Sequence, residues 1–343
     1  MKLINYEILV LMGFLLMAAC HPNSGSDGLK SDINNSGTML INQQLGPAPG
    51  SYQIDGDENP VTLPFEFYGM NLMVKAQKNG LNINMLIDNG VMWDELFFYG
   101  SDQVDSLGMK YEGNTHVVGA GEGEGIDSYT ASDVAISFGK IHFSGQSAVI
   151  TAKEHGFADY FPGVAGQVCG AFFKHFIVEF NFDDQTIKLH KPDGYKYTGN
   201  GTAVQMTRDS SGAYSIPVNI KLVDKSQIDY RLFIDLGGIH PASLVISEKY
   251  GISKPLHSEK TILGYGASGE INGYKGLIDR FKIEPYELNN VAAVFTEADN
   301  DGDHTNTTIG LALLKRFNLV FDYFHEKLYI EPNSHFNDPY IEL

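Results

Sequence analysis

The sequence predicts a mostly β protein made of two similar halves, and two observations support that prediction. The first is a pair of matching segments, residues 85–90 and 232–237, in which hydrophobic residues lead into an aspartate and a glycine follows two positions later. Hydrophobic residues before the aspartate are typical of a buried strand, and the glycine permits a tight turn. The second is a frequent alternation of apolar and polar residues, which is typical of antiparallel sheets.

The alternating segments are short and separated by glycine and asparagine turns, as expected for strands. They are clearest at residues 82–87, 133–138, 213–222 and 276–283. Candidate helices are few and short, chiefly at 171–175 and 311–316. The chain is therefore expected to form two β lobes with little helix.

Two further features follow each aspartate in the same order. A glycine-rich turn comes first, at 117–124 and again at 262–270, and an aromatic segment comes next, at 172–182 and 313–323. A single offset superposes a lysine and several aromatic residues of the two aromatic segments. Matching features in one order and at nearly one spacing predict an internal repeat, in which each copy is a supersecondary unit.

The N-terminal residues are expected to lie outside the repeats. Residues 1–19 are interpreted as a lipoprotein signal peptide, because the apolar run is too short to span a bilayer and ends in small residues before Cys20. Cys20 is the expected lipidation site of an exported protein. A simple secretory peptide or an apolar N-terminal helix is the alternative. Residues 20–58, rich in Asn, Ser, Gly and Asp, are expected to be a flexible tether, with folded sequence beginning near Val61.

The rest of the chain is divided into an N-terminal lobe over residues 59–195 and a C-terminal lobe over residues 196–343. The polar, glycine-rich segment 192–201 is the expected join. Lipidation of Cys20 would leave Cys169 as the only thiol, so no intrachain disulfide is expected, and Cys169 is interpreted as buried packing.

Composition argues against several classes of function. The net charge is −18, from 42 acidic and 24 basic residues, and no basic patch interrupts the acidic excess, so nucleic acid is disfavoured as a partner. No His-Glu-x-x-His motif indicates catalytic zinc, and no Gly-x-Ser-x-Gly motif indicates a serine hydrolase. Residues 299–303 resemble the start of a calcium loop, but the terminal acidic ligand is missing, so a solvated acidic loop is expected. No metal and no cofactor are predicted.

Each half resembles a retropepsin-type aspartic peptidase unit, and the whole resembles bacterial two-lobed aspartyl proteases with a pepsin-like architecture. The family pattern is hydrophobic-hydrophobic-Asp-Thr/Ser-Gly, then a flap hairpin, then hydrophobic-hydrophobic-Gly before a short helix and a closing hairpin. The corresponding segments here are 86–90, 117–125 and 168–189, then 233–237, 262–270 and 309–330. The resemblance covers roughly residues 60–333 and implies the bilobal acid-protease fold, with two homologous barrel-like lobes.

The resemblance implies that Asp88 and Asp235 form a catalytic dyad. Like charges in contact cannot both ionise, so one carboxyl stays protonated while the other takes a proton from the water that attacks the scissile carbonyl. The two roles are exchangeable by pseudosymmetry. The alternative is a pair of ordinary turn aspartates, because Asp-x-Gly is common in turns.

The expected substrate-binding residues are the glycines of the two Asp-x-Gly turns and the residues of the two flaps. They are Gly90, Gly119, Gly121, Gly237, Gly264, Tyr265 and Gly266. Tyr265 is the aromatic residue expected to touch the ligand, and the alternative is an ordinary exposed hairpin tip.

The sequence departs from the family pattern at several places. Asn89 and Leu236 replace the hydroxyl residues that would link the two loops, and only the Asn89 side chain can hydrogen-bond. Residues 91–92 and 238–239 lack the usual small or hydroxyl side chains. An ungapped alignment places Cys169 where the second copy has a glycine, whereas a one-residue deletion would place a glycine there.

Three functions remain open. The first is an exported, lipid-anchored, monomeric aspartic-type endopeptidase that acts on peptides or unfolded protein at a bacterial membrane. The second is a catalytically inactive relative that binds peptides or partner proteins through the same site. A surface lipoprotein that serves as a scaffold in a membrane assembly is a third possibility.

Overall fold

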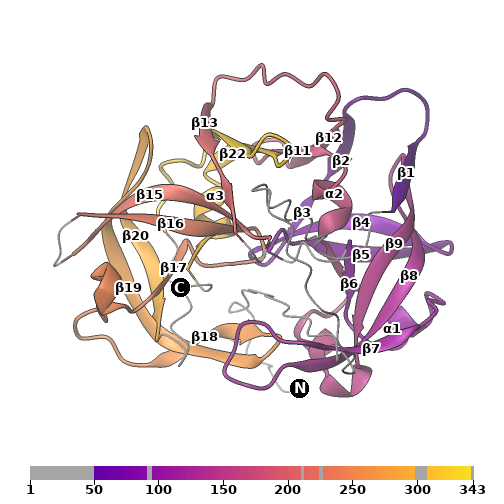
Figure 1. The fold of residues 1–343 in the computed structure, drawn as a ribbon, viewed down its shortest axis with the longest axis horizontal. Coiled ribbons are helices and arrows are strands. Elements are labelled where there is room, and N and C mark those ends of the chain that lie inside the picture. Colours follow the sequence, from indigo (N-terminus) through magenta and orange to yellow (C-terminus); the bar gives the residue numbers. More distant parts are fainter. Residues whose placement is uncertain (1–49, 91–94, 210–211, 224–226, 298–306, 341–343) are drawn as a thin grey trace, which may run out of the picture.

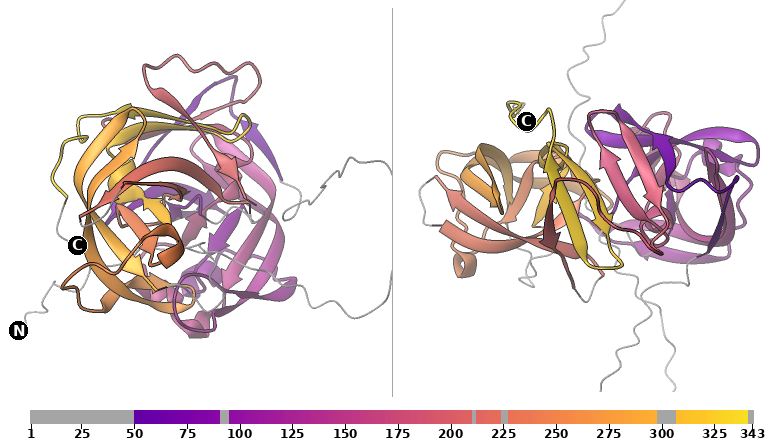
Figure 2. Two further views of the ribbon diagram at one scale, coloured as in Figure 1. Left: turned by 60° about the vertical axis from the view of Figure 1, so that its left-hand side comes forward. Right: turned by 90° about the horizontal axis from the view of Figure 1, so that it is seen from above.

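The computed structural model describes most of the chain from residue 50 onward. The described residues are 50–90, 95–209, 212–223, 227–297 and 307–340. The predicted signal peptide, Cys20 and the acidic segment 299–303 lie outside them. The described chain is mostly β and has two lobes side by side with a sheet between them (Figures 1 and 2). No helix within these ranges is long and apolar enough to cross a membrane.

The N-terminal lobe is a twisted sheet in which β8 pairs with both β4 and β9, closing the ring β9-β6-β10-β5-β4-β8. Its strands are β1 (Ser51–Ile54), β3 (Glu66–Tyr68), β4 (Asn71–Lys78), β5 (Leu81–Ile87), β6 (Leu96–Phe98), β7 (Gly113–Val117), β8 (Ile126–Phe138), β9 (Ile141–Thr151) and β10 (Gly166–Val168). Most pairings are antiparallel, but β10 runs parallel to β5. A closed ring leaves few free strand edges and encloses a packed interior.

The C-terminal lobe repeats this plan, because β15 pairs with both β16 and β19 and closes the ring β15-β16-β21-β17-β20-β19. Its strands are β14 (Thr207–Arg208), β15 (Tyr214–Leu222), β16 (Gln227–Asp235), β17 (Ala242–Val245), β18 (Thr261–Gly266), β19 (Gly269–Ile283), β20 (Tyr286–Thr296) and β21 (Thr308–Gly310). Here β21 runs parallel to β16, as β10 does to β5. The two lobes therefore share one topology.

A third sheet joins the lobes, in the order β13-β23-β22-β11-β12-β2. Its strands are β2 (Val61–Pro64), β11 (Ile177–Asn181), β12 (Thr186–His190), β13 (Thr202–Gln205), β22 (Phe317–Asp322) and β23 (Lys327–Pro332). The lobes meet where β11 pairs antiparallel with β22, with Phe180 opposite Leu319. One hydrophobic core runs through both lobes and this sheet, so the lobes form a single packed body.

The helices are short. They are α1 (Asp102–Asp105), α2 (Gly170–Phe173) and α3 (Leu311–Leu314), with 3₁₀ turns η1 (Lys153–His155), η2 (Phe157–Tyr160) and η3 (Glu248–Tyr250). Helix α3 falls inside the predicted segment 311–316, and helix α2 begins one residue before the predicted segment 171–175. Both are fully buried, which explains why their apolar residues show no amphipathic period.

The predicted tether extends too far. Strand β1 lies inside the range 20–58 and pairs with β9, so folded sequence is already present at Ser51, ten residues before Val61. Tyr52 of β1 packs on Phe176, with ring centroids 4.5 Å apart. A four-residue edge strand flanked by glycine gives too short an alternation to be recognised in a polar segment.

Candidate active site

Each aspartate of the repeated motif stands at the end of a strand that is held by a parallel neighbour. Asp88 follows β5, and its backbone N–H donates to the carbonyl of Val168 in β10 at 3.2 Å. Asp235 ends β16 and lies opposite Gly310 of β21. A carboxyl at the end of a buried strand is costly unless another group uses it. Both side chains are buried, at 0% and 1% exposure.

The two carboxyl groups face one another. A methyl group placed on Gly90 would lie 3.1 Å from Asp88 Oδ1 and 3.2 Å from Asp235 Oδ1, so both oxygens border the same point. A methyl group on Gly237 would lie 2.6 Å from the Asp88 carboxyl carbon. Glycine is therefore required at position 237, because a side chain there would collide with Asp88, whereas a side chain at position 90 would crowd both carboxyl groups.

The turn glycines also hydrogen-bond the carboxyl groups. The Gly90 N–H donates to Asp88 Oδ1 at 2.7 Å, and the Gly237 N–H donates to Asp235 Oδ1 at 2.9 Å. Burial raises the pKa of both aspartates, and the charge of Asp88 raises the pKa of Asp235 further, against the opposing effect of nearby backbone N–H groups. The pair can therefore hold one proton well above the acidic range in which free aspartate ionises.

Asn89 links the two loops from one side only. Its Oδ1 accepts the Leu236 N–H at 2.7 Å, and its Nδ2 donates to the Ile234 carbonyl at 3.2 Å and to the Tyr323 hydroxyl at 2.8 Å. The amide thus reaches the backbone on both sides of Asp235. The Leu236 side chain packs in the hydrophobic core. The sequence predicted that, of the two residues, only the Asn89 side chain can hydrogen-bond across the loops.

Gln167 is a site residue that sequence reasoning missed. It lies in β10 opposite Leu86, is 1% exposed, and donates from Nε2 to Asp88 Oδ2 at 3.0 Å. Tyr99 is also buried near the dyad, and its pKa is raised by burial and then by the charge of Asp88. A glutamine inside the apolar run 164–169 was the available signal, since a buried polar residue needs a partner.

Cys169 occupies the position of Gly310, so the one-residue deletion considered from the sequence is wrong. The helix α2 begins directly after Cys169, as α3 begins directly after Gly310. A methyl group on Gly310 would lie 2.2 Å from the His240 carbonyl oxygen, whereas the N-terminal lobe accommodates the Cys169 side chain. Cys169 is buried, and it packs in a hydrophobic cluster with Leu86.

The two glycine-rich turns meet each other between the lobes. They connect β7 to β8 and β18 to β19, and Figure 1 shows them converging at the bottom of the molecule. The Gly123 N–H donates to the Ser268 carbonyl at 2.6 Å, and the Ser268 N–H donates to the Ala120 carbonyl at 3.0 Å. The Glu122 N–H donates to the Glu270 carbonyl at 3.0 Å. The hairpins therefore join through backbone hydrogen bonds.

Three of the predicted flap glycines lie in this contact. The Gly119 N–H donates to Ser268 Oγ at 3.2 Å. A methyl group on Gly121 would lie 2.4 Å from the Ser268 carbonyl carbon, and one on Gly266 would lie 2.1 Å from the Ala120 carbonyl oxygen. Glycine is needed at both positions because the two backbones approach too closely for a side chain.

The other two predicted flap residues lie beside the contact. Gly264 pairs with Ile271 within the second hairpin. Tyr265 stacks on Tyr160 of η2 in the other lobe, with ring centroids 5.3 Å apart. The Tyr265 ring therefore bridges the lobes.

The tip of the second hairpin enters the N-terminal lobe. Ala267 is 3% exposed and belongs to the hydrophobic cluster that borders the dyad. The other buried members of this cluster, hereafter the aromatic cluster, are Leu86, Phe97, Tyr99, Val117, Ile126, Val149, Phe157, Phe161, Val164 and Cys169. The two hairpins are thus placed on the same side of the sheet as Asp88.

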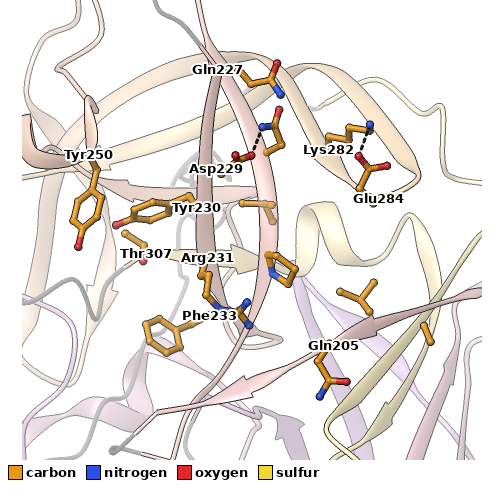
Figure 3. A pocket seen from close by; sticks show the side chains of 15 residues that line it. Gln205, Gln227, Asp229, Tyr230, Arg231, Phe233, Tyr250, Lys282, Glu284 and Thr307 are labelled. Carbon is orange, nitrogen blue, oxygen red and sulfur yellow. Dashed lines mark hydrogen bonds and ion pairs between the residues drawn. The ribbon is translucent and has the colours of Figure 1, made fainter.

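A cavity of about 870 Å³ lies elsewhere, lined by β15 and β16 of the C-terminal lobe and by β13 of the joining sheet (Figure 3). Arg231, Phe233 and Asp229 of β16 line it, together with Tyr250 and Thr307. These β16 residues alternate with those that face the core, and neither aspartate of the dyad lines the cavity. This cavity is therefore separate from the dyad. Within the described ranges, no group of three or more His, Cys, Asp or Glu side chains could hold a metal ion.

Comparisons with known proteins agree with this geometry at the level of the fold. No protein-family model matches the sequence, and no curated protein sequence matches it either. Among solved structures, an aspartic proteinase from Irpex lacteus is similar with a TM-score of 0.50 and 14% identity, over 82% of this chain and 100% of that chain. The fold is that of the pepsin-like aspartic proteinases. Basic 7S globulin from soybean is also similar, with a TM-score of 0.47 and 11% identity, over 84% of this chain and 100% of that chain.

Proposed function

We propose that this protein is an aspartic-type endopeptidase that hydrolyses peptide bonds with Asp88 and Asp235. The observation that carries the proposal is the meeting of the two buried carboxyl groups at one point, with Asp235 Oδ2 making no hydrogen bond to a described residue. A buried carboxyl oxygen without a partner is costly, and a ligand hydrogen bond would remove that cost.

The chemistry follows from a pair that holds one proton. The ionised carboxylate takes a proton from a water molecule as the water oxygen bonds to the scissile carbonyl carbon. The protonated carboxyl donates to the carbonyl oxygen, where negative charge develops. As the C–N bond breaks, the proton gained by the carboxylate passes to the leaving nitrogen. No metal and no covalent intermediate is needed.

The substrate would be an extended segment of a peptide or unfolded protein. The joined hairpins carry backbone donors and acceptors beside the dyad, and a strand-like peptide could pair with them after they separate. Such a peptide would replace the contacts that the hairpins now make with each other. Closing over the substrate would exclude bulk water from the carboxyl groups.

The test compares wild type with Asp88→Asn and Asp235→Asn on a denatured protein substrate from pH 3 to 8. We expect cleavage by wild type and a rate at least 100-fold lower in either variant, because a carboxamide can neither ionise nor share a proton with the remaining carboxyl group. Asp279→Asn is the matched control, since Asp279 is half-exposed and pairs with Lys221 on the surface. An absence of cleavage by wild type throughout this range would refute the peptidase.

A catalytically inactive peptide-binding protein is the second candidate. Two observations favour it: the one-sided link through Asn89, and the hairpin contact that covers the dyad side of the aromatic cluster. Saturable binding of an unfolded protein without turnover would support this candidate. Isothermal titration with wild type and Asp235→Asn measures the binding, and the absence of cleavage by wild type is what distinguishes a binder, because a peptidase could also keep its affinity in the variant.

We also propose that the protein is exported as a monomer and anchored to a bacterial membrane through lipid on Cys20. The support is the apolar N-terminal run followed by small residues and a cysteine. Incorporation of labelled fatty acid should occur in wild type and be absent in Cys20→Ser. Equal labelling of the two proteins would contradict the anchor.

A further inference from the structure

The hydrogen bonds around the dyad are unequal, although the two halves share one topology. Asp88 accepts at both oxygens, from the Gly90 N–H at 2.7 Å and from the Gln167 amide at 3.0 Å. Asp235 accepts from the Gly237 N–H at 2.9 Å, and the Gly238 N–H also lowers its pKa, but its Oδ2 makes no well-aligned hydrogen bond to a described residue. Among the described residues, Asp88 therefore receives a side-chain donor, from Gln167, whereas the donors beside Asp235 are backbone N–H groups.

Strand register identifies the counterpart of Gln167 in the second half. Gln167 lies opposite Leu86, two residues before Asp88, and Thr308 lies opposite Phe233, two residues before Asp235. The threonine side chain is shorter than that of glutamine and carries no amide group. The pseudosymmetry is therefore broken at this pair of positions.

A hydrogen bond from a neutral amide stabilises a carboxylate more than a neutral carboxyl group. The oxygen without a partner, Asp235 Oδ2, is suited instead to carry a proton and donate it to a ligand. We propose that Gln167 is a positioning residue that assigns the roles of the dyad: Asp88 is held as the base, and Asp235 as the acid. This inference rests on the proposed peptidase function.

Other titratable groups near the dyad do not compete with this assignment. Tyr99 is buried beside Asp88, and burial raises its pKa, so its hydroxyl is neutral wherever the dyad holds one proton. Tyr323 is buried against Asn89, and its pKa is also raised by burial. Cys169 is a buried thiol at the end of β10. In the first step of hydrolysis, the proton released by water thus goes to Asp88, and Asp235 donates to the carbonyl oxygen.

A second oxygen without a hydrogen-bond partner, on the Gln167 side chain, is consistent with the proposed role of Gln167. Gln167 Oε1 is buried and has no hydrogen-bond partner among the described residues. An amide retained with one end unsatisfied in an apolar strand costs stability. The effect of Gln167 on the ionisation of Asp88 would explain why an amide is present at this costly position.

The experiment replaces Gln167 by methionine, which has nearly the same length and no donor. The acidic limb of the kcat/KM profile reports ionisation of the base. We expect this limb to move to higher pH by about 1 to 2 units in Gln167→Met, the size expected for one hydrogen bond to a charged group. Thr308→Val is the matched control on the other strand and should leave the limb in place. An unshifted limb in a folded Gln167→Met protein would overturn the assignment.

Infrared titration of ¹³C-aspartate-labelled protein separates this inference from the proposed function. The first ionisation of the dyad should shift upward in Gln167→Met and not in Thr308→Val, whether or not the protein cleaves peptides. A shift without cleavage would refute only the peptidase. Cleavage without a shift would refute only the role of Gln167. Thermal unfolding at the acidic end checks that each variant is folded.

Discussion

The surroundings of Asp88 and Asp235 differ far more than the strands that carry them. Both aspartates leave a strand held by a parallel neighbour, and each receives a hydrogen bond from the glycine two residues later. Beyond that shared frame, the N-terminal half supplies the side-chain amides of Asn89 and Gln167, and the C-terminal half supplies backbone groups, the Tyr323 hydroxyl and the apolar Leu236 side chain. The comparison teaches that a duplicated backbone can be kept while the polar groups that tune it are concentrated on one side.

Gly237 gives the severest test of the shared frame. Gly237→Ala would place a methyl group 2.6 Å from the Asp88 carboxyl carbon. We expect cleavage to fall by more than 100-fold, because a displacement of about 1 Å at the reacting groups has an effect of that size. Peptidase assays measure the rate, and urea unfolding measures the accompanying loss of stability.

Gly113→Ala is the control for that substitution. Its methyl group would meet only Thr130 Oγ1, at 3.1 Å, near the edge of the N-terminal sheet. We expect its rate to stay within about twofold of wild type, because the strained contact can relax without moving the dyad. Equal losses in the two variants would mean that the Gly237 effect is general destabilisation.

Substitution of Asn89 tests the side-chain hydrogen bonds that the N-terminal half supplies. Asn89→Ala would leave the Leu236 N–H, the Ile234 carbonyl and the Tyr323 hydroxyl without their partner. Each buried group left unsatisfied costs about 1–3 kcal/mol, so we expect a loss of roughly 3–5 kcal/mol in the free energy of unfolding. Urea denaturation at a fixed pH measures it.

Asn89→Thr sharpens the same prediction. A threonine hydroxyl can accept one hydrogen bond and donate another, so it should recover part of the lost stability. A threonine variant as unstable as the alanine variant would show that the loop link does not depend on these hydrogen bonds.

The sequence predicted the frame of this comparison better than its differences. The Asp-x-Gly repeat, the two short helices and the glycine-rich turns follow from local patterns that recur, and repetition distinguishes such patterns from chance. Asn89 was recognised because the motif marks its position. Gln167 was missed because its role depends on register between β5 and β10, which adjacent residues in the chain do not reveal. The joined hairpins depend on how the lobes are placed, which is not a local property.

The dyad also predicts how stability depends on pH. Burial raises the folded-state pKa of Asp235 above the unfolded value, so the folded state binds more protons between these two values. Stability is therefore highest below the unfolded pKa and falls as the pH rises toward the folded pKa. We expect Asp235→Asn to be more stable than wild type at pH 7, with a smaller difference near pH 4.

Urea unfolding of both proteins across that range checks the sign. Asp279→Asn serves again as the control, because Asp279 is half-exposed and pairs with Lys221. A constant difference between wild type and Asp235→Asn at every pH would mean that the carboxyl group of Asp235 titrates alike in the folded and unfolded states.

The smallest expected effect concerns the hairpins, where the two halves touch directly. Ala267→Glu would place a charge among the buried side chains of the aromatic cluster, and burying an unpaired charge is unfavourable. Moving the hairpin tip outward avoids that cost and breaks the backbone bonds between Gly123 and Ser268. We expect amide exchange at Gly123 and Ser268 to accelerate by at least tenfold while exchange in β5 and β16 stays unchanged, because the hairpins open locally. Leu277→Glu, at an exposed position of β19, should leave all four regions as in wild type.

If the hairpins separate in this way, peptide should also reach the dyad faster, since the contact that the two halves make with each other is the one that a substrate must replace. Faster exchange throughout both lobes would instead mean that the hairpin contact is part of the global core.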